Sequence, residues 1–347
     1  MNNIDTALGE VCRQFPLRTG TIYKRAHEYC QDVKEKCQNI LSKYMADNGL
    51  DPTSFCFVAI GSVGRMEALD ASDLDLLPVV RKKSDLQRFK RHDSKIRKVL
   101  EQSLNLHVSE GKDLTACVAL KDLTDQKTVG GEKDSNTALT KRVLLLTEGT
   151  RLAGDLSLAV IRTKVLECYG KCERTSGRHV LSLCNDIARY YRTLCIEYKA
   201  KVDVYEKDWC TRNLKLRHSR KFWYFATVLS IVSLAEEHLA TDAYTEALVQ
   251  ELERPPVLRL ASAAKRLQPL SLTDIYERYA YFLEFMAKKE HREALAKVNH
   301  ADRYNAIIEN PFPCMKLNSD LVEKEMIRVI GQLPAHVREN IYKWFLL

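Results

Sequence analysis

The sequence contains no apolar run long enough to cross a bilayer. A membrane-spanning helix needs about 20 consecutive, mainly apolar residues, whereas the longest apolar-rich segment covers only residues 222–235. The opening residues, MNNIDTALGE, also lack the basic start and apolar core of a signal peptide. We therefore expect a cytoplasmic protein with no membrane partner, in which residues 222–235 form a buried helix.

The sequence also lacks the cysteine patterns of disulfide scaffolds and of zinc sites. Its 11 cysteines include no Cys-x-x-Cys pair, and no spacing of cysteines and histidines matches a zinc site. We find no low-complexity tract and no internal repeat. These absences leave a globular chain with reduced cysteines, whose 347 residues suit two domains of ordinary size.

The sequence has fewer acidic than basic residues: 46 Asp and Glu against 54 Lys and Arg, for a net charge of +8. This excess permits an anionic partner without requiring one, because a bound triphosphate alone would use several cations. Cations gather in a helix that we expect over residues 84–103. A solvated surface is the plainer interpretation of that helix, and a nucleic-acid surface is the alternative.

The segment with the most chemical information is residues 57–80, FVAIGSVGRMEALDASDLDLLPVV. Two aspartates, Asp73 and Asp75, stand within its second apolar run. In a strand, side chains two residues apart point to the same face, so these carboxylates project together and repel each other. A cation between them removes the repulsion, and Mg²⁺ prefers oxygen ligands and often completes its shell with substrate phosphates.

The first apolar run of this segment ends at Gly61 and Ser62, which supply the complementary part of a site. Glycine allows close approach of the backbone, and exposed N–H groups with a serine hydroxyl can hold a phosphate. A strand, a Gly-Ser turn and an Asp-x-Asp strand together predict a nucleoside triphosphate site. The bland alternative is a surface loop before an ordinary strand.

This pattern resembles the signature of the DNA polymerase β-like nucleotidyltransferase superfamily. The fuller string adds Gly64, Arg65, Glu67 and Ser72 to the turn and the aspartates. It is similar to the branch that contains the bacterial uridylyltransferases and adenylyltransferases of nitrogen signalling, with related nucleotidyltransferases of unassigned substrate. Arg65 either contacts phosphate or pins the loop, with Glu67 as its partner, and the sequence does not separate these roles.

The resemblance implies a third metal-binding carboxylate on a later strand of the same sheet. We expect one or two strands over residues 105–120 and choose Asp113, with Glu110 as the alternative ligand. The plain interpretation is that both acids lie in a turn.

The rest of the chain indicates an α+β fold: a nucleotidyltransferase-type mixed sheet flanked by helices, followed by an all-α helical domain. We expect a helix over residues 20–47 and strands over 54–60 and 74–80. The expected domains are an N-terminal helical segment (1–50), a catalytic domain (51–160) and a helical C-terminal domain (161–347). Helices are expected over 181–205, 211–239 and 271–288, and after Pro334.

Two cations of the helical part, Arg212 and Lys215, share one helix face by their spacing. The resemblance implies that they face the nucleotide and neutralise the triphosphate or the pyrophosphate leaving group. The alternative is an ion-paired surface.

The implied reaction is Mg²⁺-dependent transfer of a nucleoside monophosphate from ATP or UTP to an acceptor hydroxyl. Asp73, Asp75 and Asp113 would hold two Mg²⁺ ions, or Mn²⁺ in their place, while Gly61 and Ser62 seat phosphates. The branch favours a protein side chain as the acceptor. The alternatives are an RNA 3′ end and a non-catalytic partner in a toxin–antitoxin or defence system, and no motif identifies the acceptor or the base.

Overall fold

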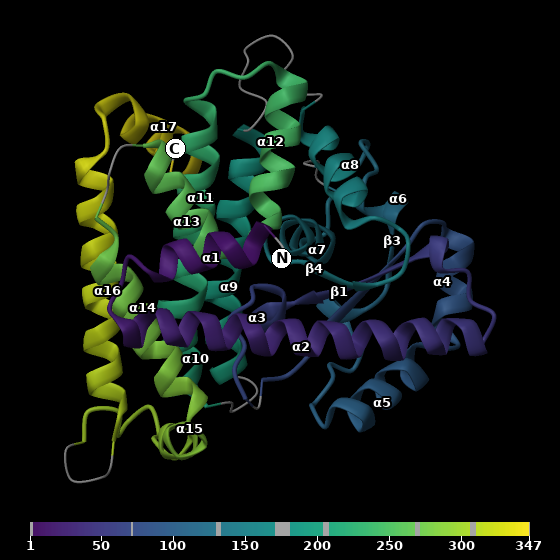
Figure 1. Cartoon of the computed structure of the whole chain (residues 1–347), viewed down its shortest axis with the longest axis horizontal. Coiled ribbons are helices and arrows are strands. Elements are labelled where there is room, and N and C mark those ends of the chain that lie inside the picture. Colours follow the sequence, from purple (N-terminus) through teal and green to yellow (C-terminus); the bar gives the residue numbers. More distant parts are fainter. Residues whose placement is uncertain are drawn as a thin grey trace. The chain divides into compact units, whose positions relative to one another are not determined.

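The computed structural model of the chain describes residues 3–70, 72–129, 133–170, 181–203, 208–267, 271–305 and 310–346 (Figure 1). These residues form two compact units, neither of which is continuous in sequence. Unit 1 contains residues 1–24, 191–238 and 256–347, and unit 2 contains residues 25–190 and 239–255. The predicted domain boundaries at 50 and 160 stay a prediction, since compact units need not coincide with domains.

Unit 2 contains a small mixed sheet of four strands. They are β1 (Phe55–Ile60), β2 (Asp75–Val80), β3 (Val118–Ala119) and β4 (Thr150–Ala153). The strand order is β3-β2-β1-β4, with β1 antiparallel to both β2 and β4 and with β2 parallel to β3. The predicted strands at 54–60 and 74–80 are confirmed, and each is buried almost throughout because apolar residues occupy both faces.

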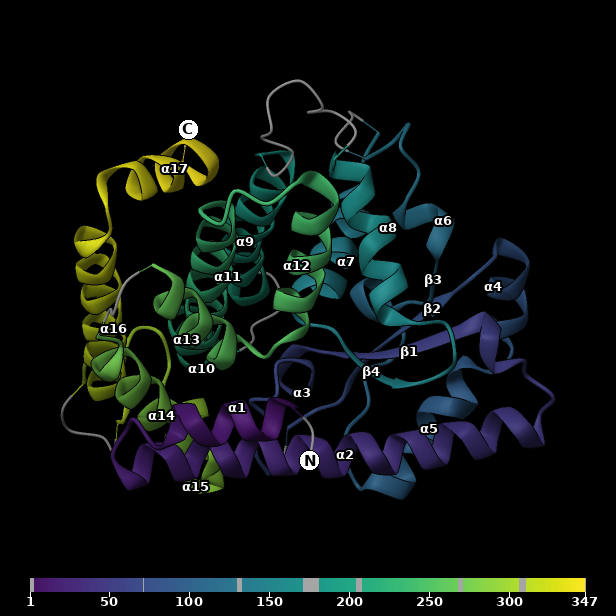
Figure 2. The same ribbon diagram turned by 45° about the horizontal axis from the view of Figure 1, so that its top comes forward.

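Helices cover both sides of this sheet, as Figure 2 shows for α2 and α5 on one side of β1 and α7 and α8 on the other. The helical segments that lie wholly in unit 2 are η1 (Pro52–Ser54), α3 (Gly61–Gly64), α4 (Lys83–Lys90), α5 (Asp93–Leu104), η2 (Asp113–Thr115), α6 (Leu120–Leu123), α7 (Asn136–Thr147), α8 (Leu158–Gly170) and α12 (Thr241–Glu253). Two helices pass from one unit to the other, α2 (Leu17–Asp47) and α9 (Leu181–Asp203). The helix expected over 20–47 is therefore confirmed.

The core of unit 2 forms where α2 meets the sheet. Cys30, Val33 and Cys37 from α2 are buried among apolar side chains of β1, β2, α4 and α5, including Phe57 and Phe89. Their spacing of three and four residues places them along one stripe of the helix. Burial of this stripe fixes α2 against the sheet.

Unit 1 is built from helices in the part that the structure describes. They are α1 (Asn3–Cys12), α10 (Trp209–Lys215), a π turn η3 (Leu216–Arg220), α11 (Lys221–Ala235), α13 (Pro256–Arg266), α14 (Thr273–Ala287), α15 (Lys289–Ala296), α16 (Phe312–Gln332) and α17 (Ala335–Phe345). The helix α11 is buried nearly all round, as its apolar sequence predicts. The α+β class with a helical C-terminal region is thus confirmed. Within the described residues, none of the helices is long and apolar enough to span a membrane.

The structure corrects the bounds of two elements expected at the edge of the sheet. The basic helix expected over 84–103 is two helices, α4 and α5, because the chain turns at Arg91 and His92. The strands expected over 105–120 shrink to β3 and a single parallel bridge between Leu74 and Val108. The residues between them leave the sheet in a turn through Gly111, whose φ of +75° favours glycine.

Buried Arg97 explains why the chain leaves the edge of the sheet between Val108 and β3. Its guanidinium donates to the backbone oxygens of Ser109, Leu76 and Thr115 at 2.6, 3.2 and 2.9 Å. A side chain therefore takes carbonyl groups that a continuous neighbouring strand would have bonded. The Arg97 charge is balanced by Asp93 at 2.7 Å on the same helix.

Candidate functional site

The Gly-Ser turn directly follows β1, where α3 begins at Gly61. Gly61 has a φ of +71°, in the left-handed region that favours glycine. A Cβ atom at Gly61 would lie 2.5 Å from the Oδ2 atom of Asp75, much closer than two such atoms can approach. The positive φ is the reason that this position favours glycine, and the absence of a side chain lets the Asp75 carboxylate lie against the turn.

Asp75 begins β2 directly opposite Ile60, the last residue of β1. Leu74 is fully buried and exchanges backbone hydrogen bonds with His107 and Ser109 at 2.8 and 3.1 Å. Alternation about Leu74 puts Asp73 and Asp75 together on the side away from the core. Asp73 is exposed and Asp75 is half-buried, so both carboxylates remain accessible beside the turn.

Arg65 is buried within the loop that joins the turn to β2. Its side chain is 4% exposed and forms ion pairs with Glu67 and Glu148, each at 2.8 Å. Of the two roles open from the sequence, this geometry favours pinning of the loop over contact with phosphate. Arg65 also supplies the positive charge without which two buried carboxylates would be strongly destabilising.

Glu148 is a residue of the site that the sequence reasoning did not identify. It ends α7, its side chain is fully buried, and its Oε2 atom accepts from the backbone N–H of Gly61 at 3.2 Å and from Arg65. The bond occupies the Gly61 N–H, which the Gly-Ser pattern predicts as a phosphate donor. The half-buried Ser62 remains as a polar side chain of the turn. The available signal is an acidic residue directly after the apolar run of α7.

Gly64 packs the end of the turn against the backbone of β1 and of Glu148. A Cβ atom there would lie 2.5 Å from the backbone oxygens of both Ala59 and Glu148. The hydroxyl of Thr150 also donates to the Gly64 oxygen at 2.8 Å. The turn is thus held between β1 and the end of α7, which gives it a fixed position relative to Asp75.

Beneath the loop, α2 contributes a buried thiol. Cys30 lies 3.8 Å from the backbone oxygen of Ala68, and burial raises its pKa to about 12, with a smaller contribution from the negative charge of Glu67. Cys30 is therefore a neutral packing residue and not a nucleophile at ordinary pH.

The candidates for the third carboxylate lie in the turn that interrupts the sheet edge. Asp113 begins η2, is exposed and has a φ of +48°, while exposed Glu110 forms an ion pair with Lys112 at 2.7 Å. Within the described ranges, no group of three or more His, Cys, Asp or Glu side chains is arranged to hold a metal ion. The roles of Asp113 and Glu110 as metal ligands therefore stay predictions.

Asp73 and Asp75 by themselves fit a magnesium ion. They offer only oxygen donors, on one side of one strand and beside the Gly-Ser turn. Mg²⁺ is commonly held by one or two carboxylates together with substrate phosphates. The pair therefore suits this ion without a third protein ligand.

Arg212 and Lys215 lie on α10 of unit 1, which begins after the Asp208 cap. Arg212 is half-buried and Lys215 is exposed, and in the described parts of the chain neither forms an ion pair. This arrangement disfavours the ion-paired surface that was the alternative for them. Their contact with a triphosphate stays a prediction.

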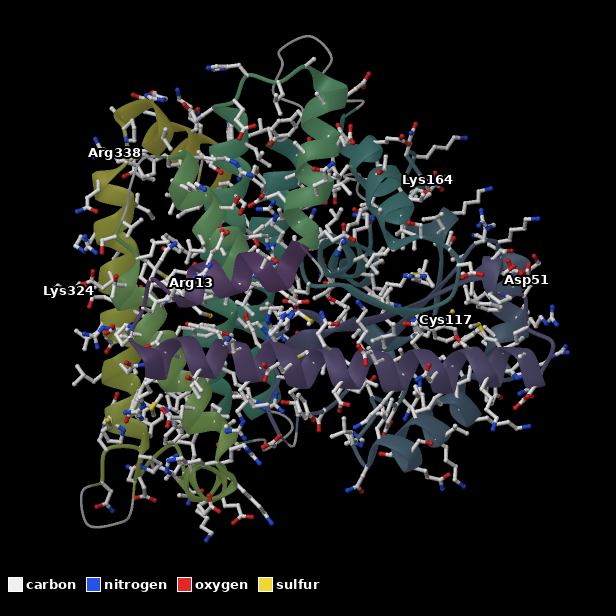
Figure 3. The ribbon with its side chains drawn as sticks, in the orientation of Figure 1. Arg13, Asp51, Cys117, Lys164, Lys324 and Arg338 are labelled. Carbon is white, nitrogen blue, oxygen red and sulfur yellow. The ribbon has the colours of Figure 1, made fainter. Side chains whose placement is uncertain are left out.

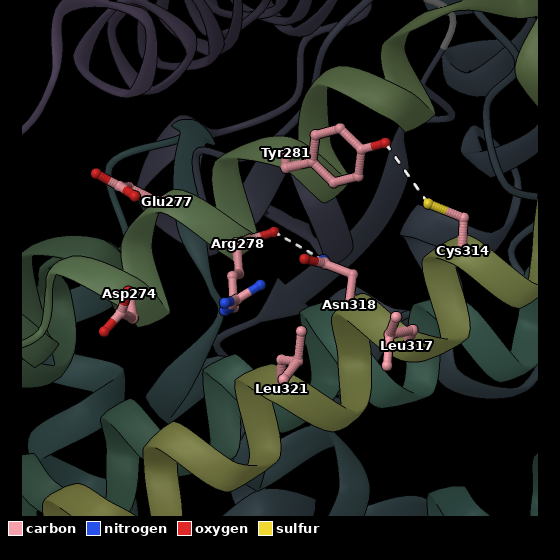
Figure 4. Close-up of a pocket in the computed structure, with 8 residues that line it drawn as sticks. All are labelled: Asp274, Glu277, Arg278, Tyr281, Cys314, Leu317, Asn318 and Leu321. Carbon is pink, nitrogen blue, oxygen red and sulfur yellow. Dashed lines mark hydrogen bonds between the residues drawn. The ribbon is translucent and has the colours of Figure 1, made fainter.

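A separate groove of about 370 Å³ lies between α14 and α16 in unit 1 (Figure 4). Its polar lining includes Asp274, Glu277 and Arg278, and the Asn318 amide donates to the Arg278 backbone oxygen at 3.0 Å. None of the predicted site residues lines this groove. It has no part in the site at the Gly-Ser turn.

Residues 10–103 match the family model described as "Putative nucleotidyltransferase DUF294". The match includes Gly61, Ser62, Asp73 and Asp75, and it ends before Glu148. It confirms the resemblance to nucleotidyltransferases that the segment 57–80 shows. No curated protein matches the chain.

Proposed function

We propose that this protein transfers a nucleoside monophosphate from a nucleoside triphosphate to an acceptor hydroxyl and releases pyrophosphate. The observation that carries the proposal is the contact between the Gly-Ser turn and the Asp-x-Asp strand, in which Gly61 leaves room for the Asp75 carboxylate. The match of residues 10–103 to a nucleotidyltransferase family supports the same chemistry at a coarse level.

The chain's own residues position the nucleotide. Ser62 offers a hydroxyl to the β and γ phosphates, and the glycine backbone allows them to approach closely. Asp73 and Asp75 would hold Mg²⁺, with Mn²⁺ as a substitute and with Asp113 or Glu110 as the third ligand if a second ion binds. When bound, the metal neutralises phosphate charge and favours loss of the acceptor proton.

The reaction itself is an in-line displacement. The acceptor oxygen loses its proton and forms a bond to the α phosphorus, while the bond from that phosphorus to the bridging oxygen breaks. Pyrophosphate leaves with the bonding electrons, and we propose that Arg212 and Lys215 neutralise its charge. Glu148 and Arg65 hold the turn during this step and do not touch the reacting atoms.

The first candidate acceptor is a hydroxyl of a protein side chain, and the candidate donors are ATP and UTP. Both follow from the resemblance to uridylyltransferases and adenylyltransferases. The second candidate acceptor is an RNA 3′ end. It is favoured by the concentration of cations in α4 and α5, which lie in the same unit as Asp73 and Asp75.

Labelled nucleotides test the proposal. The protein is incubated with each α-labelled triphosphate, Mg²⁺ and a host lysate, and the label is then followed into protein, RNA and small molecules. We expect covalent label in protein, and none with the double variant Asp73→Asn, Asp75→Asn. Label in RNA would select the second acceptor. Absence of label with every triphosphate would contradict transfer and favour a non-catalytic partner module.

A further inference from the structure

The positive charge of this protein is concentrated in one short segment. Residues 81–103 contain nine Lys and Arg and three Asp and Glu, so they carry +6 of the chain's net +8. The remaining residues are close to neutral as a group. A partner that recognises positive charge would therefore find it at α4 and α5.

The acidic residues of this segment are already engaged. Asp85 accepts the Lys82 backbone N–H at 3.1 Å, and Asp93 pairs with buried Arg97. The third acid, Glu101, contacts His107 at 3.0 Å. None of the three carboxylates faces an exposed cation of the segment at ion-pair distance, so its positive charge is not neutralised from within.

Four exposed cations form what we call the basic face: Lys90, Arg91, Lys95 and Lys98. Over the ranges that the structure describes, none of their side chains forms a hydrogen bond or an ion pair. An ordinary solvated helix intersperses acids and bases at spacings of three and four residues, where they stabilise each other. In the basic face the acid at such a spacing, Glu101, contacts His107 and not Lys98, so the four cations are left available to an anionic partner.

The surroundings of the basic face favour a phosphate backbone over a protein as its partner. Protein interfaces depend on aromatic and apolar anchors, and charged residues are depleted at their centres. The large apolar side chains that the structure leaves exposed all lie outside residues 81–104. The segment instead exposes the neutral side chains of Ser84, Gln87 and Ser94, which can bond to hydroxyl groups.

The fold brings α5 back beside the start of β2. Arg97 lies between Lys95 and Lys98 in sequence, points inward, and donates to the backbone oxygen of Leu76, the residue after Asp75. Helix α5, which carries Lys95 and Lys98, is therefore anchored beside the strand that begins with Asp75. We propose that the basic face binds the phosphate backbone of single-stranded RNA, with 2′-hydroxyl groups bonded by the neutral side chains.

Binding is measured without triphosphate or Mg²⁺, so that it does not depend on transfer. The probe is a fluorescent oligouridylate of about 20 nucleotides, followed by anisotropy over salt concentrations of about 50 to 200 mM. The test variant carries Lys90→Gln, Arg91→Gln, Lys95→Gln and Lys98→Gln. The control carries Lys265→Gln, Lys288→Gln, Lys297→Gln and Lys324→Gln, which remove the same charge from exposed positions of unit 1. Lys324 is labelled in Figure 3.

We expect the test variant to raise Kd at least about tenfold and to flatten the salt dependence by roughly 0.7 per lost contact, while the control changes little. An equal loss in the control would overturn the proposal, because net charge alone would then explain binding. If poly-L-glutamate bound as tightly as the oligouridylate, a nucleic acid would be ruled out as the specific partner. If oligodeoxythymidylate bound as tightly or more tightly, RNA would be ruled out as the preferred nucleic acid.

The role of this RNA as an acceptor rests on the proposed function, and the two can fail separately. RNA binding through the basic face without any label transfer would contradict the proposed transferase activity. It would still support the basic face as an RNA-binding surface. Label transfer to protein in the test variant at the wild-type rate, with no RNA binding by the wild type, would contradict the face alone.

Discussion

Gly61 is the residue on which the geometry of the site depends most. Its positive φ strains any residue with a side chain, and a Cβ atom there would displace the Asp75 carboxylate from the turn. We expect Gly61→Ala to cost about 1–3 kcal/mol of unfolding free energy and to abolish most transfer, because the turn and the carboxylate must separate. Urea denaturation and the labelling assay measure the two effects.

A matched control is Gly331→Ala in α16, where a new Cβ atom would meet nothing within 4 Å. This change should leave stability unchanged or raise it by up to about 1 kcal/mol, because alanine favours helix. Similar losses in both variants would contradict a special role for Gly61.

The local part of the site was predictable from sequence because its residues are close in the chain. Gly61 and Asp75 are separated only by one turn of helix and a short loop, and strand alternation alone relates Asp73 to Asp75. Glu148 was not predictable, since it reaches Gly61 across 87 residues and only the tertiary fold brings it there. Arg65 shows the same limit: its sequence position suits either a phosphate ligand or a residue that holds the loop, and its burial with Glu67 favours the second role.

Helix α7 affects the site through its last turn. Glu148→Gln keeps the size of the side chain and removes one of the two carboxylate charges that pair with Arg65. We expect a loss of about 2–3 kcal/mol in stability and a weaker affinity for triphosphate, since a neutral amide oxygen accepts more weakly from Arg65 and from the Gly61 N–H than a carboxylate does. Denaturation and a fluorescent-nucleotide titration measure these effects.

Glu339→Gln provides the comparison, because Glu339 is 62% exposed and pairs with exposed Lys343 at 3.2 Å. Its effect should stay within about 1 kcal/mol. If Glu148→Gln proved equally mild, the buried contacts of Glu148 would not hold the turn.

The edge of the sheet shows why element boundaries were harder to predict than elements. Sequence does not distinguish Arg97 from Lys95 and Lys98, since all three belong to one basic run. Only burial shows that Arg97 bonds three backbone oxygens and replaces part of a strand. The strong periodicity of α2, by contrast, fixed that helix to within a few residues.

The π turn at 216–220 contains a buried histidine that predicts a dependence of stability on pH. His218 stacks on Phe282, and its ring nitrogens contact the Leu214 oxygen and the Asn318 amide at 2.9 and 3.0 Å. The His218 pKa is lowered from 6.5 to about 4, mainly by burial and to a smaller extent by the nearby cations Lys221 and Arg217, while the Leu214 carbonyl acts in the opposite direction.

Because the pKa is lower in the folded state, the unfolded state binds the proton first as the pH falls. Unit 1 should therefore keep its full stability above about pH 6.5 and lose roughly 2–3 kcal/mol as the pH falls toward 4. Urea denaturation between pH 7 and 4 should show a shallower decline for His218→Gln. Parallel declines in the two proteins would exclude His218 as the cause.

At the scale of the whole molecule, the helical C-terminal half followed from composition, but the compact units did not. Residues 239–255 fold with the sheet-bearing unit, although apolar helical segments lie on both sides of them. Amphipathic sequences indicate that a helix will bury one face, and they do not identify the face that covers it. The location of the excess charge, in contrast, is readable from sequence alone.

The central claim is that the Asp73–Asp75 pair supports nucleotidyl transfer, and Asp75→Asn tests it most directly. We expect transfer of α-label to fall by roughly a hundredfold or more. The melting temperature should stay near the wild-type value or rise, because repulsion between the carboxylates is relieved. Asp70→Asn, at an exposed residue that pairs with Arg25 on the surface, should retain full activity. Undiminished transfer by Asp75→Asn, with its fold intact, would contradict the account.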